Sequence, residues 1–142
     1  MNEKNVCSYT NDDVAKLILR LTVAILMLFH GIAKAQHGVG GIESMLENAG
    51  LPAFIAYGVY FGEIIAPLML IFGVRVKMAA ILIIGTMIFV LAIPYADKVF
   101  MITKHGAWAI ELHIFYIATS LAIFFLGAGK YSLDEKSKKV SE

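Results

Sequence analysis

The stretch VAKLILRLTVAILMLFHGIAK, residues 14–34, decides the fold of this chain. Within this stretch, the residues from Leu21 to Phe29 include no charged side chain. An α-helix needs about 20 mostly apolar residues to cross a hydrocarbon core of about 30 Å. The stretch therefore predicts a helix that spans a membrane.

Three further segments, 51–73, 78–96 and 107–129, have a similar length and composition. Hydrophobic residues make up 59% of the 142-residue chain, against about 45–50% in a soluble domain. A soluble chain of this size cannot bury so much apolar surface. We predict an all-α membrane four-helix bundle over residues 14–131, with a polar tail at 1–13 and a charged cytoplasmic tail at 132–142.

The first segment has a competing interpretation, because Ala33-Lys34-Ala35 resembles a signal-peptidase site after an apolar run. The acidic residues Glu3, Asp12 and Asp13 ahead of the run argue against cleavage. In the loop that follows, Ile42, Met45, Leu46 and Ala49 share one side at helical spacing, before Gly50 and Pro52. This pattern predicts a short helix on the membrane surface.

Orientation follows from the lysines and arginines, which concentrate in cytoplasmic loops. Four spans place nine of them on the side of the two termini and three on the other side. We therefore expect both termini in the cytoplasm and the protein in the cell (inner or plasma) membrane. The three on the outer side are Lys34, Lys98 and Lys104.

Six titratable residues lie in or at the edge of the apolar segments, where a charge costs at least about 2.5–3.5 kcal/mol. At 1.5 Å per residue, four of them fall in the outer half and one near the midplane. We predict that they converge into one polar pocket, or that they form ion pairs such as Arg20–Glu63 and Lys34–Glu111. The six are Arg20, His30, Lys34, Glu63, Glu111 and His113.

Three neighbours are candidate ligand contacts: Met27, Tyr57 and Tyr60. Met27 shares a face of the first helix with Arg20 and Lys34. No metal is predicted, because the histidines and glutamates lack a tight motif, and Glu111 and His113 point about 200° apart on a helix. The single cysteine, Cys7, rules out a cysteine cluster within this chain.

These segments resemble the DoxX family of small four-helix membrane proteins. The first helix matches through Arg20 and through Phe29-His30-Gly31 with Lys34, and the second through Gly62-Glu63. The fourth matches through Glu111 and the run Gly127-Ala128-Gly129-Lys130-Tyr131-Ser132-Leu133-Asp134, which is similar to the family pattern G-x-G-x-Y-S-L-D. The resemblance implies the four-helix fold, a membrane location and an association with quinone-linked redox or oxidative-stress complexes.

Two functional hypotheses follow. In the first, the chain is a membrane subunit of a redox complex, its pocket holds a quinone, and a partner redox enzyme supplies electrons. The chain itself has no haem, flavin or cysteine-cluster motif. In the second, it is a non-catalytic membrane scaffold or a carrier for a small solute or ion. The expected partners are the lipid bilayer and that enzyme, with no nucleic acid, and a homo-oligomer stays open.

Overall fold

The computed structural model describes residues 12–135, and its regular structure is helical throughout. Within that range only an isolated bridge between Ile102 and Trp108 has β geometry. The predicted all-α fold is confirmed. The elements in chain order are α1 (Asp12–His37), α2 (Gly40–Asn48), η3 (Ala53–Gly58), η4 (Phe61–Ile65), α3 (Ala66–Phe72), α4 (Val76–Ala92), η5 (Ala96–Lys98) and α5 (Glu111–Leu126). Of the predicted tails at 1–13 and 132–142, residues 1–11 and 136–142 lie outside the described residues, while Asp12 and Asp13 belong to α1.

The second predicted span is not one regular α-helix. It begins with the 3₁₀ turns of η3, passes through the π-helical turn η4 and ends as α3, with Pro67 in the first turn of α3. Proline has no N–H, so it cannot donate to the carbonyl four residues earlier, which belongs to Glu63. A π turn next to that position lets the chain continue with a shifted hydrogen-bond register.

The last two helices are shorter than the predicted spans 78–96 and 107–129. α4 has 17 residues and ends two residues before Pro94, while α5 has 16 and ends at Leu126, followed by Gly127 with a φ of +75°. Residues 107–110 belong instead to a hairpin loop that includes a hydrogen bond from the Thr103 N–H to the Ala107 carbonyl. Two helical segments, α1 and Ala53–Phe72, are long and apolar enough to span a bilayer. The four-span topology with cytoplasmic termini stays a prediction.

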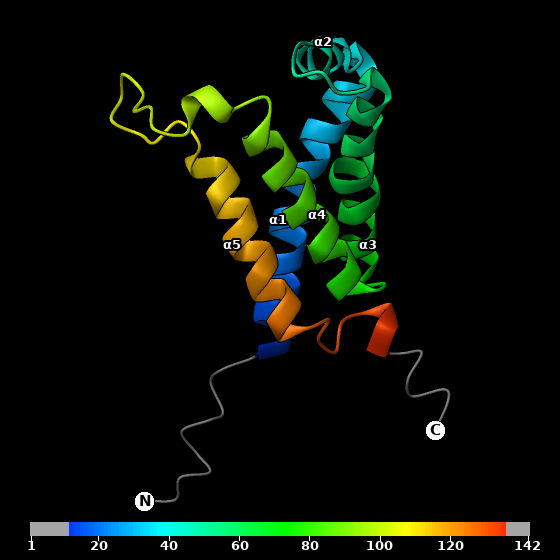
Figure 1. The fold of residues 1–142 in the computed structure, drawn as a ribbon. Helices are drawn as coiled ribbons and strands as arrows, with labels where there is room; N and C mark the ends of the chain where they lie inside the picture. The colour runs from blue at the N-terminus through cyan, green and yellow to red at the C-terminus, as the bar shows by residue number, and fades with distance from the viewer. Residues whose placement is uncertain (1–11, 136–142) are drawn as a thin grey trace, which may run out of the picture.

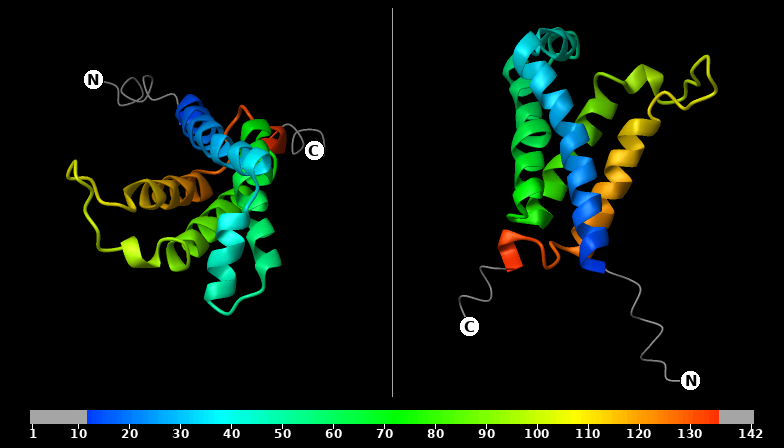
Figure 2. Two further views of the ribbon diagram at one scale, coloured as in Figure 1. Left: turned by 90° about the horizontal axis from the view of Figure 1, so that it is seen from above. Right: turned by 180° about the vertical axis from the view of Figure 1, so that it is seen from behind.

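The long segments pack in a closed order, with α1 against α3 and η4, α3 against α4, α4 against α5, and α5 back against α1. α2 crosses one end of the bundle beside η3, as Figures 1 and 2 show. α2 is the short helix that the sequence predicted after the first span, and the side chain of its Leu46 is fully buried. The start of α1 and the turn at residues 132–135 lie at the opposite end.

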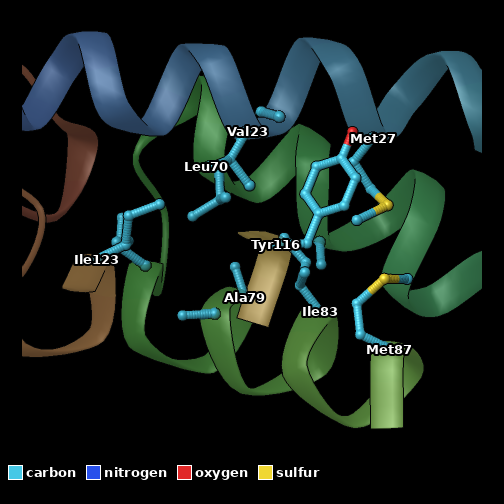
Figure 3. Packing of buried hydrophobic residues seen from close by; sticks show 12 residues of the cluster. Val23, Met27, Leu70, Ala79, Ile83, Met87, Tyr116 and Ile123 are labelled. Carbon is cyan, nitrogen blue, oxygen red and sulfur yellow. The ribbon is translucent and has the colours of Figure 1, made fainter. Parts of the chain in front are cut away.

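The core is a continuous apolar cluster to which every long helix contributes (Figure 3). Its members include Val23, Met27, Leu70, Ile83 and Ile123. The outward faces are also apolar. Each carries large exposed side chains, among them Phe29, Phe72, Ile88 and Phe115. An outer surface of this kind is unusual for a soluble monomer and fits contact with lipid.

Candidate functional site

An ion pair joins α1 to the π turn η4. The Lys34 Nζ donates hydrogen bonds to both carboxylate oxygens of Glu63, at 2.7 and 2.5 Å. The Glu63 side chain is 2% exposed and that of Lys34 is 27% exposed. Tyr60 supports the pair, because its hydroxyl donates to the Lys34 carbonyl at 3.1 Å. The Lys34–Glu63 pair is the only salt bridge among residues 12–135.

Two glycines allow the backbones to approach closely around this pair. A Cβ on Gly31 would overlap the backbone carbonyl of Glu63, and a Cβ on Gly62 would overlap the side chain of Thr86. Gly31 therefore brings α1 onto η4, one turn before Lys34, and Gly62 brings η4 onto α4. The close approach places Glu63 within reach of the Lys34 ammonium.

A cavity of about 390 Å³ opens beside the ion pair. Its polar wall contains Lys34 and Glu63, together with His30 from α1 and His113 and Tyr116 from α5. Its size falls in the range of small-molecule sites, which are mostly apolar with a few convergent polar groups. The remaining lining residues are Met27, Gly38, Val39, Gly41, Ile42, Met45, Met87, Val90, Pro94, Tyr95 and Leu112.

Aromatic contacts hold the polar side chains on the α5 side of the cavity. The His30 ring meets Tyr116 edge-on, with centroids 6.3 Å apart. The His113 ring lies 4.5 Å from the ring of Tyr95, and the Lys98 ammonium lies 4.8 Å above the same tyrosine. The Nδ1 of His113 is buried and has no hydrogen-bond partner among residues 12–135. His113 therefore lines the cavity with its ring while its Nδ1 is enclosed by the protein and left without a hydrogen bond within that range.

The predicted site residues divide into two groups. His30, Lys34, Glu63, His113 and Met27 line this one cavity. The other four predicted residues lie outside the cavity lining, and they are Arg20, Tyr57, Tyr60 and Glu111. In the structure Lys34 pairs with Glu63, so the predicted alternative pairing of Lys34 with Glu111 is wrong.

The comparisons with known proteins identify the family of this chain. The sequence model of the DoxX family matches residues 15–96, which is more than half of the chain. The chain belongs to the DoxX family. The matched range contains Arg20, His30, Lys34 and Glu63, whereas His113 lies beyond it. The predicted resemblance is confirmed, and the family together with the two long apolar helices makes this a membrane protein.

One relative of this DoxX-family protein is "Putative oxidoreductase CatD" from Bacillus subtilis (strain 168). The two chains are 30% identical over 76 residues, which cover 54% of this chain and 56% of the relative. The match therefore spans little more than half of the relative's length. No solved structure matches the chain significantly.

Arg20 lies at the other end of the DoxX-family bundle, in a contact with the C-terminal segment. It is 1% exposed, and its Nη2 donates to the Tyr131 carbonyl at 2.7 Å. A Cβ added to Gly73 would strike both the Arg20 guanidinium and Ser132, so the absence of a side chain at Gly73 leaves room for Arg20. The predicted alternative pairing of Arg20 with Glu63 is therefore wrong.

The run that ends in Asp134 closes the same end of the bundle. The Asp134 carboxylate accepts hydrogen bonds from the backbone N–H groups of Arg75 and Val76, at 2.9 and 3.2 Å. The Asp134 N–H donates to the Gly73 carbonyl at 3.0 Å. Asp134 thus caps the start of α4, which stabilises a helix by about 0.5–2 kcal/mol. The motif at residues 127–134 joins α1, α3 and α4 and lies away from the cavity.

Sequence reasoning missed two aromatic residues of the cavity, Tyr95 and Tyr116. Tyr116 follows His113 by three residues, so the two share a helix face, and this spacing could have revealed it. Tyr95 lies after the end of α4, in a turn that the sequence analysis treated as helix. The structure also explains Glu111, which is exposed at the start of α5 because it points away from the His113 face.

Proposed function

We propose that this DoxX-family protein is the membrane subunit of a redox system, and that the cavity beside Lys34 and Glu63 holds a quinone headgroup. One observation supports the proposal above others. The cavity combines an ion pair, two histidines and two tyrosines with walls of methionine and aliphatic side chains. The name of the Bacillus subtilis relative, "Putative oxidoreductase CatD", points to the same class of chemistry.

The donors of the cavity match the chemistry of a quinone. Its flat ring needs apolar and aromatic contact, and its two carbonyl oxygens need hydrogen-bond donors. Lys34 and Tyr116 line the cavity and carry an ammonium and a hydroxyl that can donate, and the imidazole rings of His30 and His113 line it beside them. Reduction of a quinone to a quinol takes two electrons and two protons. The histidines and Glu63 are groups that can exchange those protons.

The electrons come from a partner redox enzyme in this proposal, because the chain carries no haem, flavin or cysteine-cluster motif. The bilayer is the cell inner membrane, with four spans and both termini cytoplasmic. This orientation rests on the asymmetry of lysine and arginine between the two sides. It puts the cavity in the outer half of the membrane and Arg20 near the cytoplasmic face.

The test is quinone binding to the full-length protein in lipid nanodiscs. A short-tailed ubiquinone or menaquinone analogue is titrated by calorimetry, and copurified quinone is measured by mass spectrometry after solvent extraction. The Glu63→Gln variant should bind at least about tenfold more weakly, because the Lys34 ammonium loses its charged partner and its position. Glu111→Gln is the matched control, since Glu111 is exposed and lies outside the cavity lining.

The proposal is wrong if no quinone binds to the folded protein, or if the Glu63→Gln and Glu111→Gln variants bind alike. One observation favours a second function, that of a non-catalytic scaffold. Both oxygens of Glu63 are already satisfied by Lys34, as in a structural pair. A scaffold predicts no quinone binding and no solute flux into proteoliposomes, yet dispersal of a membrane complex when the protein is deleted. A carrier predicts substrate-dependent flux with this protein alone.

A further inference from the structure

A second cavity, of about 1040 Å³, lies at the end of the bundle opposite the Lys34–Glu63 pair. Three parts of the chain form it. They are the start of α1, the start of α4, and the segment that follows α5. The polar groups here play no part in the proposed quinone site.

Four basic side chains line this cavity, one more than the acidic ones. Lys16, Arg75, Lys77 and Lys130 line it. None of the four forms a salt bridge with another residue in the range 12–135. The Lys77 ammonium lies 5.5 Å from the ring centroid of Phe124, which fixes its position at the α4–α5 junction without neutralising its charge.

Three acidic residues share the cavity, but two of them already have partners. Asp13 accepts a hydrogen bond from the Lys130 backbone N–H at 2.9 Å. Asp134 accepts from the two N–H groups at the start of α4, and buried Arg20 lies within electrostatic range of it. These bonds hold the two carboxylates on backbone N–H groups, and neither carboxylate forms a salt bridge with the four cations among residues 12–135. With Glu135 as the third carboxylate, the lining has four cationic and three anionic side chains, a net charge of +1. The charged ends of the four cations are therefore not engaged in ion pairs within the described residues.

The wall next to these cations is apolar. Met78 and Ile81 of α4 and Leu126 of α5 line the cavity, and each is about half exposed. A free inorganic anion makes no favourable contact with an apolar wall. A phospholipid makes both kinds of contact, because its phosphate lies at the membrane interface while its acyl chains run along the helices.

We infer that this cavity binds the headgroup of an anionic phospholipid, with the phosphate among Lys77, Lys130, Lys16 and Arg75. The acyl chains lie along the apolar strip formed by Met78, Ile81 and Leu126. The occupant has the chemistry of phosphatidylglycerol, a single phosphodiester with a net negative charge. A zwitterionic lipid such as phosphatidylcholine places a cation next to the lysines and binds more weakly.

Native mass spectrometry of the full-length protein, with equal amounts of phosphatidylglycerol and phosphatidylcholine, tests the inference. The wild type should retain phosphatidylglycerol preferentially. Each lysine near a lipid surface changes binding by about fivefold, so the Lys77→Gln/Lys130→Gln double variant should lose roughly 25-fold. The control is Lys98→Gln/Lys104→Gln, which removes the same charge from the opposite end and should leave the adduct unchanged.

Three results would overturn the inference. They are equal retention of the two lipids by the wild type, equal losses in the two double variants, and displacement of phosphatidylglycerol by millimolar inorganic phosphate. The last would show a site for the free anion. If the Lys77→Gln/Lys130→Gln variant does not fold, by circular dichroism, the single variant Lys130→Glu replaces it. Lys130 is exposed, and its side chain makes no hydrogen bond within residues 12–135.

Discussion

Removing Lys34 and removing Glu63 should lower the free energy of unfolding by clearly different amounts. The Glu63 side chain is 2% exposed, whereas the Lys34 side chain is 27% exposed and borders the cavity. Lys34→Met leaves a buried carboxylate with no other hydrogen-bond donor among residues 12–135. Glu63→Gln leaves an ammonium that can reach water. The first variant should therefore be the more damaging one.

The magnitudes follow from the two environments. Removing one partner of a buried ion pair costs about 3–5 kcal/mol, because the charge that remains is not compensated. We expect Lys34→Met to lose stability in that range. Glu63→Gln should lose only about 1.5–3 kcal/mol, the contribution of a hydrogen bond to a charged group. The double variant removes both charges, so it should be more stable than Lys34→Met alone.

The assay is reversible unfolding in mixed micelles of a mild detergent and dodecyl sulfate, followed by circular dichroism at 222 nm in the far ultraviolet region where helices absorb. Lys104→Met and Glu111→Gln, both at exposed positions, should change the free energy of unfolding by no more than about 0.5 kcal/mol. The reasoning would be refuted if Lys34→Met and Glu63→Gln lowered the free energy of unfolding equally and the double variant lost the sum of the two amounts. Additivity within about 0.5 kcal/mol means that the two groups do not interact.

The same assay tests two further features of the fold. Gly31→Ala should cost about 1–3 kcal/mol, because its methyl group meets the rigid carbonyl of Glu63. Gly41→Ala in α2, with open space around it, should be neutral or stabilise by up to about 1 kcal/mol. Similar losses in both would mean that α1 and η4 are not in close contact. Asp134→Ala should cost about 0.5–2 kcal/mol through the lost cap of α4, while Glu135→Ala stays within about 0.5 kcal/mol. Equal losses of unfolding free energy in Asp134→Ala and Glu135→Ala would contradict the capping role of Asp134.

Depth along a helix could be read from the sequence because the rise per residue is nearly constant. That calculation put His30, Lys34 and His113 at one level, and all three line the same cavity. The opposed directions of Glu111 and His113 followed from the 100° rotation per residue. Glu111 is exposed and His113 borders the cavity, so this part of the geometry needed no tertiary information.

The partner of each charge could not be predicted in the same way. The pairing of Lys34 with Glu63 depends on the π turn η4 and on the contact at Gly31, and neither leaves a periodic pattern. Arg20 bonds to the backbone carbonyl of Tyr131, a group that every residue type carries. The 3₁₀ and π turns also change the direction of side chains along 53–65. Tyr57 and Tyr60 therefore lie outside the cavity lining, although residues three apart, such as Tyr57, Tyr60 and Glu63, would share one face of a regular α-helix.

The separation of the two polar regions bears on the choice among functions. Arg20 and Lys34 are 14 residues apart on α1, which corresponds to about 21 Å. Between them the bundle is filled by the apolar cluster that includes Met27, Leu70 and Ile83 (Figure 3). A solute could pass from the cavity to the other end only if these helices separated. The proposed quinone site needs no such path, since binding and proton exchange both take place at the end where Lys34 and His113 lie. The packing therefore favours a binding site confined to one end of the bundle over a carrier.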